Sequence, residues 1–546
     1  MKKHSKWLPA AALATAVLTG LTACSGNGAP PSQSSSAASS SSRAGAPESS
    51  AVSQDGGLPL VQEKETLRFW FYLPAANGIS DYNDSDYYQW LEEKTNVHIE
   101  WIIPVEGTET ESFNLIFASD NMPDLIMSQG SRSYKSGPDV AIADGVYLRL
   151  NDLCDQLAPN YMALINADPA LQKDTLTDEG NRWAFNYLYK DGRLGNQGPT
   201  IRQDFLDKVS MEVPVTFEDW HKVLTAFKTQ LGVEIPLFYG SSDNDGTTGD
   251  SEFLTGFNTA REFYLDGKEV KYGPMQDGYG EYLEMMKQWY AEGLIDQSFS
   301  TRNGVLDDDL ILNDKIGAVI VPASYSGSKY YPDRGAVNPE FNLVGAPIPV
   351  KKAGDTTHVR NADLLTNTMS IAVSGSTKFP ELCVRWMDYQ YTEEASFASN
   401  YGVREGESYV VEPDGSYKWG ELITNNPDGL TQNQARSKFT TLNAPFEDYT
   451  RVMGAWSETQ LAAQQIWQGG LDDGVISPAV TMTEAEQEEY ASIMGDIKTY
   501  VAEYTVGAIM NQNTPSFEDF RAQLTSMGIE RATELKQAGV DRYNER

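Results

Sequence analysis

Hydrophobic positions along this chain alternate between two kinds of pattern. A run rich in Leu, Phe, Trp and Tyr at residues 66–73 predicts a β-strand, residues 97–103 predict a second one, and 123–127 predicts a short buried strand. Apolar residues with helical spacing predict helices over 86–94 and 112–118. Strands that alternate with helices favour a largely parallel sheet covered on both faces. The first part of the chain is therefore predicted to belong to the α/β class.

The same rhythm restarts near residue 200. Thr216, followed three residues later by Asp219, has the spacing of a capping box at a helix start. Runs at 233–239 and 316–321 predict further strands, and a long apolar stripe over 490–504 predicts a mainly helical C-terminal third. A second start of the pattern in a chain of 546 residues indicates at least two lobes.

Residues 1–23 have the pattern of a secretory signal peptide. Three lysines precede an apolar run over 8–21, which is too short and too rich in Ala and Thr for a membrane span of about 20 residues. The sequence Leu21-Thr22-Ala23-Cys24 resembles a bacterial lipobox. That resemblance implies that Cys24 carries the lipid and becomes the first residue of the mature chain. Cleavage without lipid attachment is the alternative.

Residues 24–60 are rich in Ser, Ala and Gly, which predicts a flexible tether. The chain has a formal net charge of −35, and residues 1–57 hold four basic and two acidic side chains, so the negative charge resides in the part beyond them. Binders of nucleic acid carry basic patches, so this class is excluded. Anionic membrane surfaces also repel such a body, and a lipid must therefore supply the anchor.

Two cysteines besides Cys24 fall on predicted helical stripes. Cys154 shares its stripe with Leu150 and Leu157, and Cys383 lies beside Trp386. Both are predicted to be small core residues. A disulfide between them remains an alternative in an oxidising compartment.

Motifs that carry catalysis are absent from the sequence. It contains no Gly-x-Ser-x-Gly elbow, no phosphate-binding loop and no His-Glu-x-x-His. His98, His221 and His358 are scattered, and a chain with 77 acidic residues contains carboxylate pairs by chance. We predict no catalytic residue, with a surface glycoside hydrolase as the alternative.

Five short motifs occur in an order and spacing that resemble those of a known family. They are residues 122–126, 147–153, 201–208, 289–296 and 401–406, beginning with Met-Pro-Asp-Leu-Ile. The chain from about residue 67 resembles the family 1 extracellular solute-binding proteins, which serve ABC importers for carbohydrates. It is most similar to the long lipoprotein branch linked to uronic acids and complex oligosaccharides.

The resemblance implies an α/β, two-lobe periplasmic-binding-protein-like (type II) fold that closes on its ligand at a hinge. Lobe 1 would contain residues 61–199 and 362–400, and lobe 2 residues 200–361 and the helical 401–546. No cofactor is implied.

Sugars need flat apolar faces and planar polar groups, which gives a set of candidate ligand-binding residues. In lobe 1 they are Tyr72, Ser128, Gln129 and Arg132, which end or follow predicted strands. In lobe 2 they are Arg202, Asp243, Tyr325 and Tyr330. Arg202 could bind a ligand carboxylate or form a salt bridge within the protein, and both readings stay open.

One loop nearly matches an EF-hand calcium loop. Ser241, Asp243, Asp245 and Gly246 are followed by Glu252, six residues after the glycine. Serine at the first ligand position and the preceding predicted strand depart from the pattern. The loop is therefore predicted to be either a weak Ca²⁺ site at Asp243, Asp245 and Glu252 or a polar connection that binds sugar hydroxyls.

The resemblance as a whole implies a lipid-anchored, monomeric receptor on the extracellular face of the cell membrane of a Gram-positive bacterium. It would capture an oligosaccharide between its lobes and deliver it to the membrane subunits of an ABC permease. A peptide-binding or sensory receptor of the same fold is a further alternative, which competition between peptides and sugars would separate.

The anchor can be tested directly. Cys24→Ala should give unprocessed or freely released protein, because no other segment of the acidic chain would bind a membrane. Detergent-phase partitioning measures this, with Ser25→Ala as the control. A Cys24→Ala variant that is processed and still enters the detergent phase would show that the anchor lies elsewhere.

Overall fold

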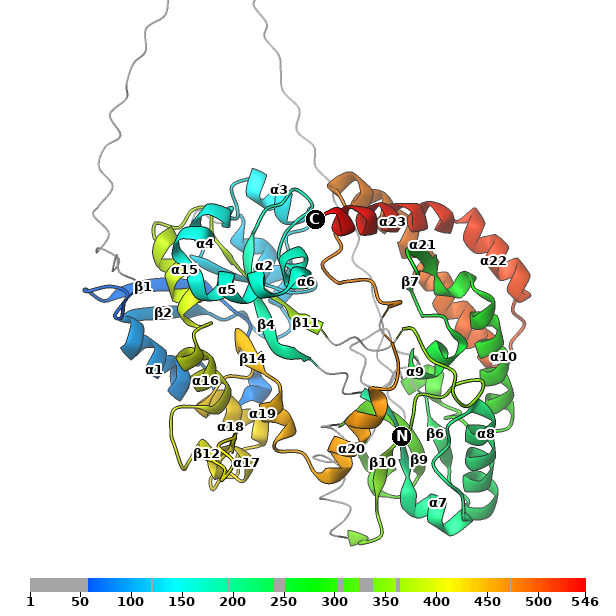
Figure 1. The fold of residues 1–546 in the computed structure, drawn as a ribbon. Helices are drawn as coiled ribbons and strands as arrows, with labels where there is room; N and C mark the ends of the chain where they lie inside the picture. The colour runs from blue at the N-terminus through cyan, green and yellow to red at the C-terminus, as the bar shows by residue number, and fades with distance from the viewer. Residues whose placement is uncertain are drawn as a thin grey trace, which may run out of the picture. The chain divides into compact units, whose positions relative to one another are not determined.

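The computed structural model describes residues 57–118, 121–193, 197–239, 251–302, 306, 308–323, 337–359, 364–471 and 473–546. Within these residues, two separate sheets each have their own hydrophobic core (Figure 1). The predicted α/β class and two-lobe fold are therefore confirmed. No helix in the described part of the chain is long and apolar enough to span a membrane.

The first lobe is built on a six-stranded sheet with the order β14-β4-β11-β3-β1-β2. Its strands are β1 (Glu65–Trp70), β2 (Val97–Ile102), β3 (Leu125–Ser128), β4 (Ala184–Arg193), β11 (Leu364–Val373) and β14 (Phe446–Asp448). Five strands run parallel, and β11 runs antiparallel between β3 and β4. The predicted largely parallel sheet is confirmed here.

Helices cover this sheet and form its core with it. They are α1 (Asp86–Thr95), α2 (Glu109–Ile116), α3 (Pro138–Ala143), α4 (Asn151–Leu157), α5 (Pro159–Ala167), α6 (Pro169–Asp174), α15 (Pro380–Tyr389) and α16 (Glu393–Tyr401). Cys154 and Cys383 are both buried in this core as free thiols. Burial raises the pKa of the Cys154 thiol to about 12, so the predicted core role is confirmed.

The second lobe is built on a four-stranded sheet with the order β10-β5-β9-β6. Its strands are β5 (Gln197–Arg202), β6 (Ile235–Phe238), β9 (Ile316–Pro322) and β10 (Leu343–Gly345), and β7 (Phe263–Asp266) pairs with β8 (Glu269–Tyr272) as a separate hairpin. In this sheet β5 runs antiparallel to its neighbours β10 and β9, and β6 runs parallel to β9. Both antiparallel strands, β5 and β11, directly follow a crossing of the chain between lobes.

Helices of the second lobe come from two distant parts of the chain. They are α7 (Gln203–Val209), α8 (Phe217–Ala226), α9 (Ser251–Leu254), α10 (Asp277–Ala291), α11 (Phe299–Arg302), α12 (Asp308–Leu312), α20 (Glu458–Trp467), α21 (Glu484–Ile509), α22 (Phe517–Ser526) and α23 (Ile529–Glu545). The predicted capping box is confirmed at the start of α8, where the Thr216 and Asp219 side chains bond each other's backbone N–H. The apolar faces of α21, α22 and α23 share one core with α10.

The chain does not return to the second lobe where the sequence analysis expected. That analysis assigned residues 401–546 to lobe 2, but β14 pairs in parallel with β4 of the first sheet. The elements α17 (Glu421–Thr424), α18 (Gln432–Phe439), α19 (Thr450–Met453) and the β12–β13 hairpin (Tyr409–Val411, Tyr417–Trp419) precede or follow β14. Trp419 Nε1 donates to the Asn400 carbonyl at 3.0 Å, and Ser85 Oγ donates to the Thr440 carbonyl at 2.8 Å. Residues 401–448 therefore pack on the first lobe, and the crossing falls between 448 and 458.

Trp467 at the end of α20 anchors the returning chain on the second sheet. Its indole is almost fully buried, and Nε1 donates to the carbonyls of Ala346 at 3.0 Å and Pro199 at 3.3 Å. Gly198 lies against the ring, because an added Cβ there would be 2.4 Å from Nε1. The indole at the end of α20 therefore joins the start of β5 to the residue that follows β10.

Loss of this indole donor should destabilise the fold. Trp467→Phe keeps an aromatic ring but removes the N–H that the buried Ala346 carbonyl accepts, which should cost about 1–3 kcal/mol. A lower urea midpoint measures the loss, with the half-buried Trp90→Phe as the matched control. Equal midpoints for the two variants would contradict this role of Trp467.

Candidate functional site

A cavity of about 460 Å³ lies past the end of β3 in the first lobe. In the strand register, Ser370 of β11 is paired with Ser128 on one side and with Asn186 of β4 on the other. The remaining wall comes from the turn after α6 and from residues that precede α21. The lining residues are Ser128, Gln129, Gly130, Ser133, Tyr134, Gly137, Pro138, Tyr147, Asp174, Leu176, Thr177, Trp183, Asn186, Thr366, Thr368, Ser370, Pro478, Ala479 and Thr481.

Hydroxyl and amide groups dominate the polar part of this lining. Thr366, Thr368 and Ser370 of β11 all line the cavity, along a stretch in which the register of β11 with β4 shifts. Among the lining residues that the structure describes, Asp174 is the one charged side chain. The cavity is therefore polar, rich in hydrogen-bonding groups and poor in charge.

Several of these polar side chains hold one another in place. Gln129 Nε2 donates to Thr368 Oγ1 at 3.0 Å, and Asn186 Nδ2 donates to Ser370 Oγ at 3.2 Å. Ser128 Oγ donates to Ser133 Oγ at 3.2 Å. Such contacts fix the orientation of groups that a ligand would meet and lower the entropy lost on binding.

An aromatic stack forms one side of the cavity. The Trp183 ring lies on the buried Tyr147 ring with centroids 5.7 Å apart and planes at 20°. Tyr134 is next to Tyr147, at 6.1 Å between centroids, and its hydroxyl donates to Asp144 at 2.7 Å. That hydrogen bond, together with burial, raises the pKa of Tyr134 above its usual value. Trp183 is only half-buried, so part of its indole lines the cavity.

Trp183 was missed in the sequence analysis, which did not name it among the candidate ligand-binding residues. The informative signal was its position: a large aromatic ring directly follows the polar residues Asn181 and Arg182, at the very start of the strand. A ring at a strand end is less enclosed than one in the middle of the strand.

The predicted residues of the first lobe come together beside this cavity. Ser128 and Gln129 line it. Arg132 Nη2 donates to Gln129 Oε1 at 3.0 Å, and the Arg132 guanidinium lies 4.9 Å from the centre of the Tyr72 ring. Burial, followed by the charges of Glu109 and Glu106, raises the pKa of Tyr72. Arg132 therefore contacts a lining residue, Gln129, and Tyr72 lies behind it against the Arg132 guanidinium.

Arg202 lies apart from that group, in the second lobe. Its guanidinium is fully buried, with Nε and Nη2 each 2.7 Å from the two Asp204 carboxylate oxygens and Nη1 2.8 Å from Asp314. The Phe205 and Phe341 rings enclose it. Of the two readings left open for Arg202, the structure has the salt bridge within the protein.

The other predicted residues fall largely outside the described part of the chain. Cys24, Asp243, Asp245, Tyr325 and Tyr330 all lie outside it. Glu252 is described in α9: its side chain is 3% exposed and accepts a hydrogen bond from Gln197 Nε2 at 3.0 Å. Among the described residues, no cluster of three or more His, Cys, Asp or Glu side chains is arranged to hold a metal.

Comparison with known proteins identifies distant relatives. No protein-family profile matches the chain. Over 512 residues it is 23% identical to the fructooligosaccharide ABC transporter substrate-binding protein of Streptococcus pneumoniae serotype 4, covering 88% of this chain and 91% of that protein. It is also 22% identical over 267 residues to a Bacillus subtilis lipoprotein, covering 47% of this chain and 50% of that one.

Solved structures agree on the fold. An alginate-binding protein, crystallised without calcium ion, superposes with a TM-score of 0.69 at 19% identity and covers 90% of this chain and all of its own. A solute-binding protein of Bifidobacterium longum infantis that binds human milk oligosaccharides superposes at 0.72 with 18% identity, over 88% of this chain and 99% of its own.

The fold is therefore that of the two-lobe solute-binding proteins. The resemblance to extracellular solute-binding proteins of ABC importers, inferred from five sequence motifs, is confirmed.

Proposed function

We propose that this protein is the substrate-binding subunit of an ABC importer and that it binds a neutral oligosaccharide in the cavity beside β3. The observation that carries the proposal is the lining itself, in which hydroxyls and amides surround the exposed part of the Trp183 stack. A flat indole can cover the C–H face of a sugar ring, while amides and hydroxyls exchange hydrogen bonds with the sugar hydroxyls.

The charge of the lining indicates whether the cavity would bind a neutral or an acidic sugar. The relatives include proteins named for neutral fructooligosaccharides and one named for alginate, an acidic polymer. A bound carboxylate needs a cationic or otherwise strong partner, since an unpaired buried charge is costly. The described lining offers the carboxylate of Asp174 and no Arg, Lys or His, which supports a neutral ligand.

The cavity also favours binding over hydrolysis. Glycoside hydrolysis uses two carboxyl groups on either side of the scissile bond, whereas Asp174 is the single carboxylate of the described lining. Its Oδ1 already accepts hydrogen bonds from Tyr543 and Ser477. The relatives are likewise named as binding proteins of transporters.

We also propose the cellular setting. The lipid on Cys24 would hold the protein at the extracellular face of the membrane, with residues 24–60 as the tether. The monomeric receptor would then pass its sugar to the permease subunits by closing and opening at its hinge, without breaking a bond.

A ligand screen tests the function. Neutral oligosaccharides, including kestose and human milk oligosaccharides, should raise the melting temperature, because a ligand at 100 times its Kd adds about 2.7 kcal/mol of stability. Oligomers of galacturonate and alginate should not. Stabilisation by the uronates alone would contradict a neutral ligand, and stabilisation by peptides alone would overturn the proposed transport of sugars.

The indole of Trp183 should contribute much of the affinity. Trp183→Ala should weaken binding of the best neutral sugar by roughly thirtyfold, equal to about 2 kcal/mol, measured by titration calorimetry. Trp90→Ala, a half-buried tryptophan of α1 outside the cavity, is the matched control. Melting curves of both variants separate lost affinity from lost stability, and unchanged affinity in a folded Trp183→Ala protein would move the binding site elsewhere.

We further propose one weak calcium site in the loop from Ser241 to Glu252. Calcium prefers oxygen ligands, and the buried carboxylate of Glu252 is of that type. Titration of the metal-stripped protein with Ca²⁺ should release or absorb heat, and Glu252→Gln should abolish that heat because a main ligand is lost. Without heat and without a change in melting, the loop is a polar connection only.

A further inference from the structure

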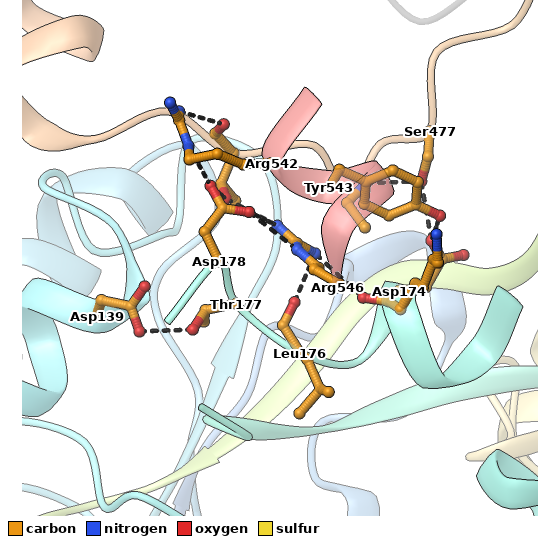
Figure 2. A network of polar contacts seen from close by, with 12 residues as sticks. Asp139, Asp174, Leu176, Thr177, Asp178, Ser477, Arg542, Tyr543 and Arg546 are labelled. Carbon is orange, nitrogen blue, oxygen red and sulfur yellow. Dashed lines mark hydrogen bonds and ion pairs between the residues drawn. The ribbon is translucent and has the colours of Figure 1, made fainter. Parts of the chain in front are cut away.

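The end of α23 connects the two lobes. Helix α23 belongs to the second lobe, since its apolar residues Ile529 and Ala532 are part of that core. Gln537 also accepts a hydrogen bond from the Val270 N–H in the β7–β8 hairpin at 2.7 Å. From Arg542 onward, the side chains at the end of the helix contact the turn at residues 174–178 of the first lobe (Figure 2).

The turn at 174–178 is firmly part of the first lobe. Thr177 Oγ1 donates to Asp139 Oδ1 at 2.6 Å, and Arg182 Nη1 donates to Thr175 Oγ1 at 2.8 Å. Leu171, at the preceding turn of α6, is buried in the first core. Contacts between α23 and this turn therefore join bodies that have separate cores.

Two carboxylates of the turn receive these contacts. Asp178 Oδ2 accepts from Arg542 Nε at 3.0 Å, and Asp178 Oδ1 accepts from Arg546 Nε at 2.9 Å. Asp174 Oδ1 accepts from the Tyr543 hydroxyl at 2.6 Å. Figure 2 shows Arg542 and Arg546 approaching Asp178 from opposite sides. The Arg546 side chain is only 3% exposed and that of Asp178 is 14% exposed, so solvent screens this pair weakly.

Arg542 bridges anions of both lobes. Besides Asp178, it contacts Glu486 in the first turn of α21, with Nη1 to Oε1 at 3.0 Å. Burial alone would raise the pKa of Asp178, but the hydrogen bonds from Arg546 and Arg542 outweigh it and hold this pKa below its usual range. The pair is therefore charged at neutral pH, and a charge-assisted hydrogen bond is stronger than a neutral one.

The same turn forms a wall of the cavity. Asp174, Leu176 and Thr177 line it together with Thr481, and Thr481 Oγ1 donates to Asp178 Oδ2 at 3.1 Å. Gly539 of α23 lies so close to this segment that an added Cβ would be 2.6 Å from the Thr481 carbonyl oxygen. Separation of α23 from the turn would therefore open the cavity on this side.

We propose that Arg542, Tyr543 and Arg546 form a latch between the lobes, which positions the 174–178 wall of the cavity and stabilises the conformation in which the two lobes are in contact there. Opening must break the contacts to Asp174 and Asp178 while Arg542 keeps Glu486 as its partner. The latch thus sets how readily the cavity releases its ligand. This consequence rests on the proposed function, whereas the latch itself does not.

The latch can be tested without a ligand. Spin labels at the exposed positions Glu93→Cys in the first lobe and Gln230→Cys in the second, in the Cys24→Ala background, report the distance between the lobes. The double variant Arg542→Gln/Arg546→Gln should shift the distance distribution to longer values. The matched control is Arg531→Gln, on the same helix, because Arg531 pairs with Glu489 inside the second lobe.

A substitution in the first lobe tests the same contacts from the other side of the latch. Asp178→Asn alters the first lobe and should give the same shift, and combining it with the double variant should add little, because both remove the same contacts. In kestose titrations the latch variants should weaken binding about tenfold and the Arg531→Gln control should not. An unchanged distance distribution in both latch variants would overturn the latch. Absence of kestose binding in the wild type would count against this sugar and leave the distance result standing.

Discussion

The position of one indole constrains the path of the chain. Trp467 contacts Gly198 where the chain first enters the second sheet, and its ring leaves no space for a side chain at that glycine. The indole N–H also donates to the carbonyl of Ala346, near the point where the chain leaves the sheet. The helix that carries it, α20, is reached only after the third crossing. Three segments that run between lobes are thus joined around a single buried ring, and each lobe is completed by residues from distant parts of the chain.

That path explains how the cavity is built. The strand β3 ends early and leaves room past its last residue, and its longer neighbour β11 extends beyond it and lines this room with Thr366 and Thr368. The remaining wall cannot come from the same sheet. It comes from the turn after α6 and from the segment before α21, so the first lobe supplies the chemistry and the second lobe contributes to the enclosure.

The sequence allowed the architecture to be predicted because long apolar patterns define it. The strands at 66–73 and 97–103 and the capped helix at Thr216 were found within a few residues of their observed bounds. The path after residue 401 was not, because β14 has only three residues and carries no apolar run. Its place depends on pairing with β4, a contact between residues more than 250 positions apart that no local pattern encodes.

The candidate site was predicted only in part for a related reason. Ser128 and Gln129 could be found because polar residues that directly follow a buried strand mark its end. Trp183 and the residues of the latch could not be found from the sequence. A ring at a strand start looks like core in the sequence, and nothing near Asp178 indicates that its partners lie at Arg542 and Arg546.

The two free thiols in the core of the first lobe have a consequence for how such a protein matures. Burial raises the pKa of both Cys154 and Cys383, so almost no thiolate exists at neutral pH to attack another sulfur. Because Cys154 and Cys383 form no disulfide in the structure, the core of the first lobe needs no oxidase or isomerase to join them. Once the lobe is folded, these two buried thiols are also protected from disulfide exchange with other proteins.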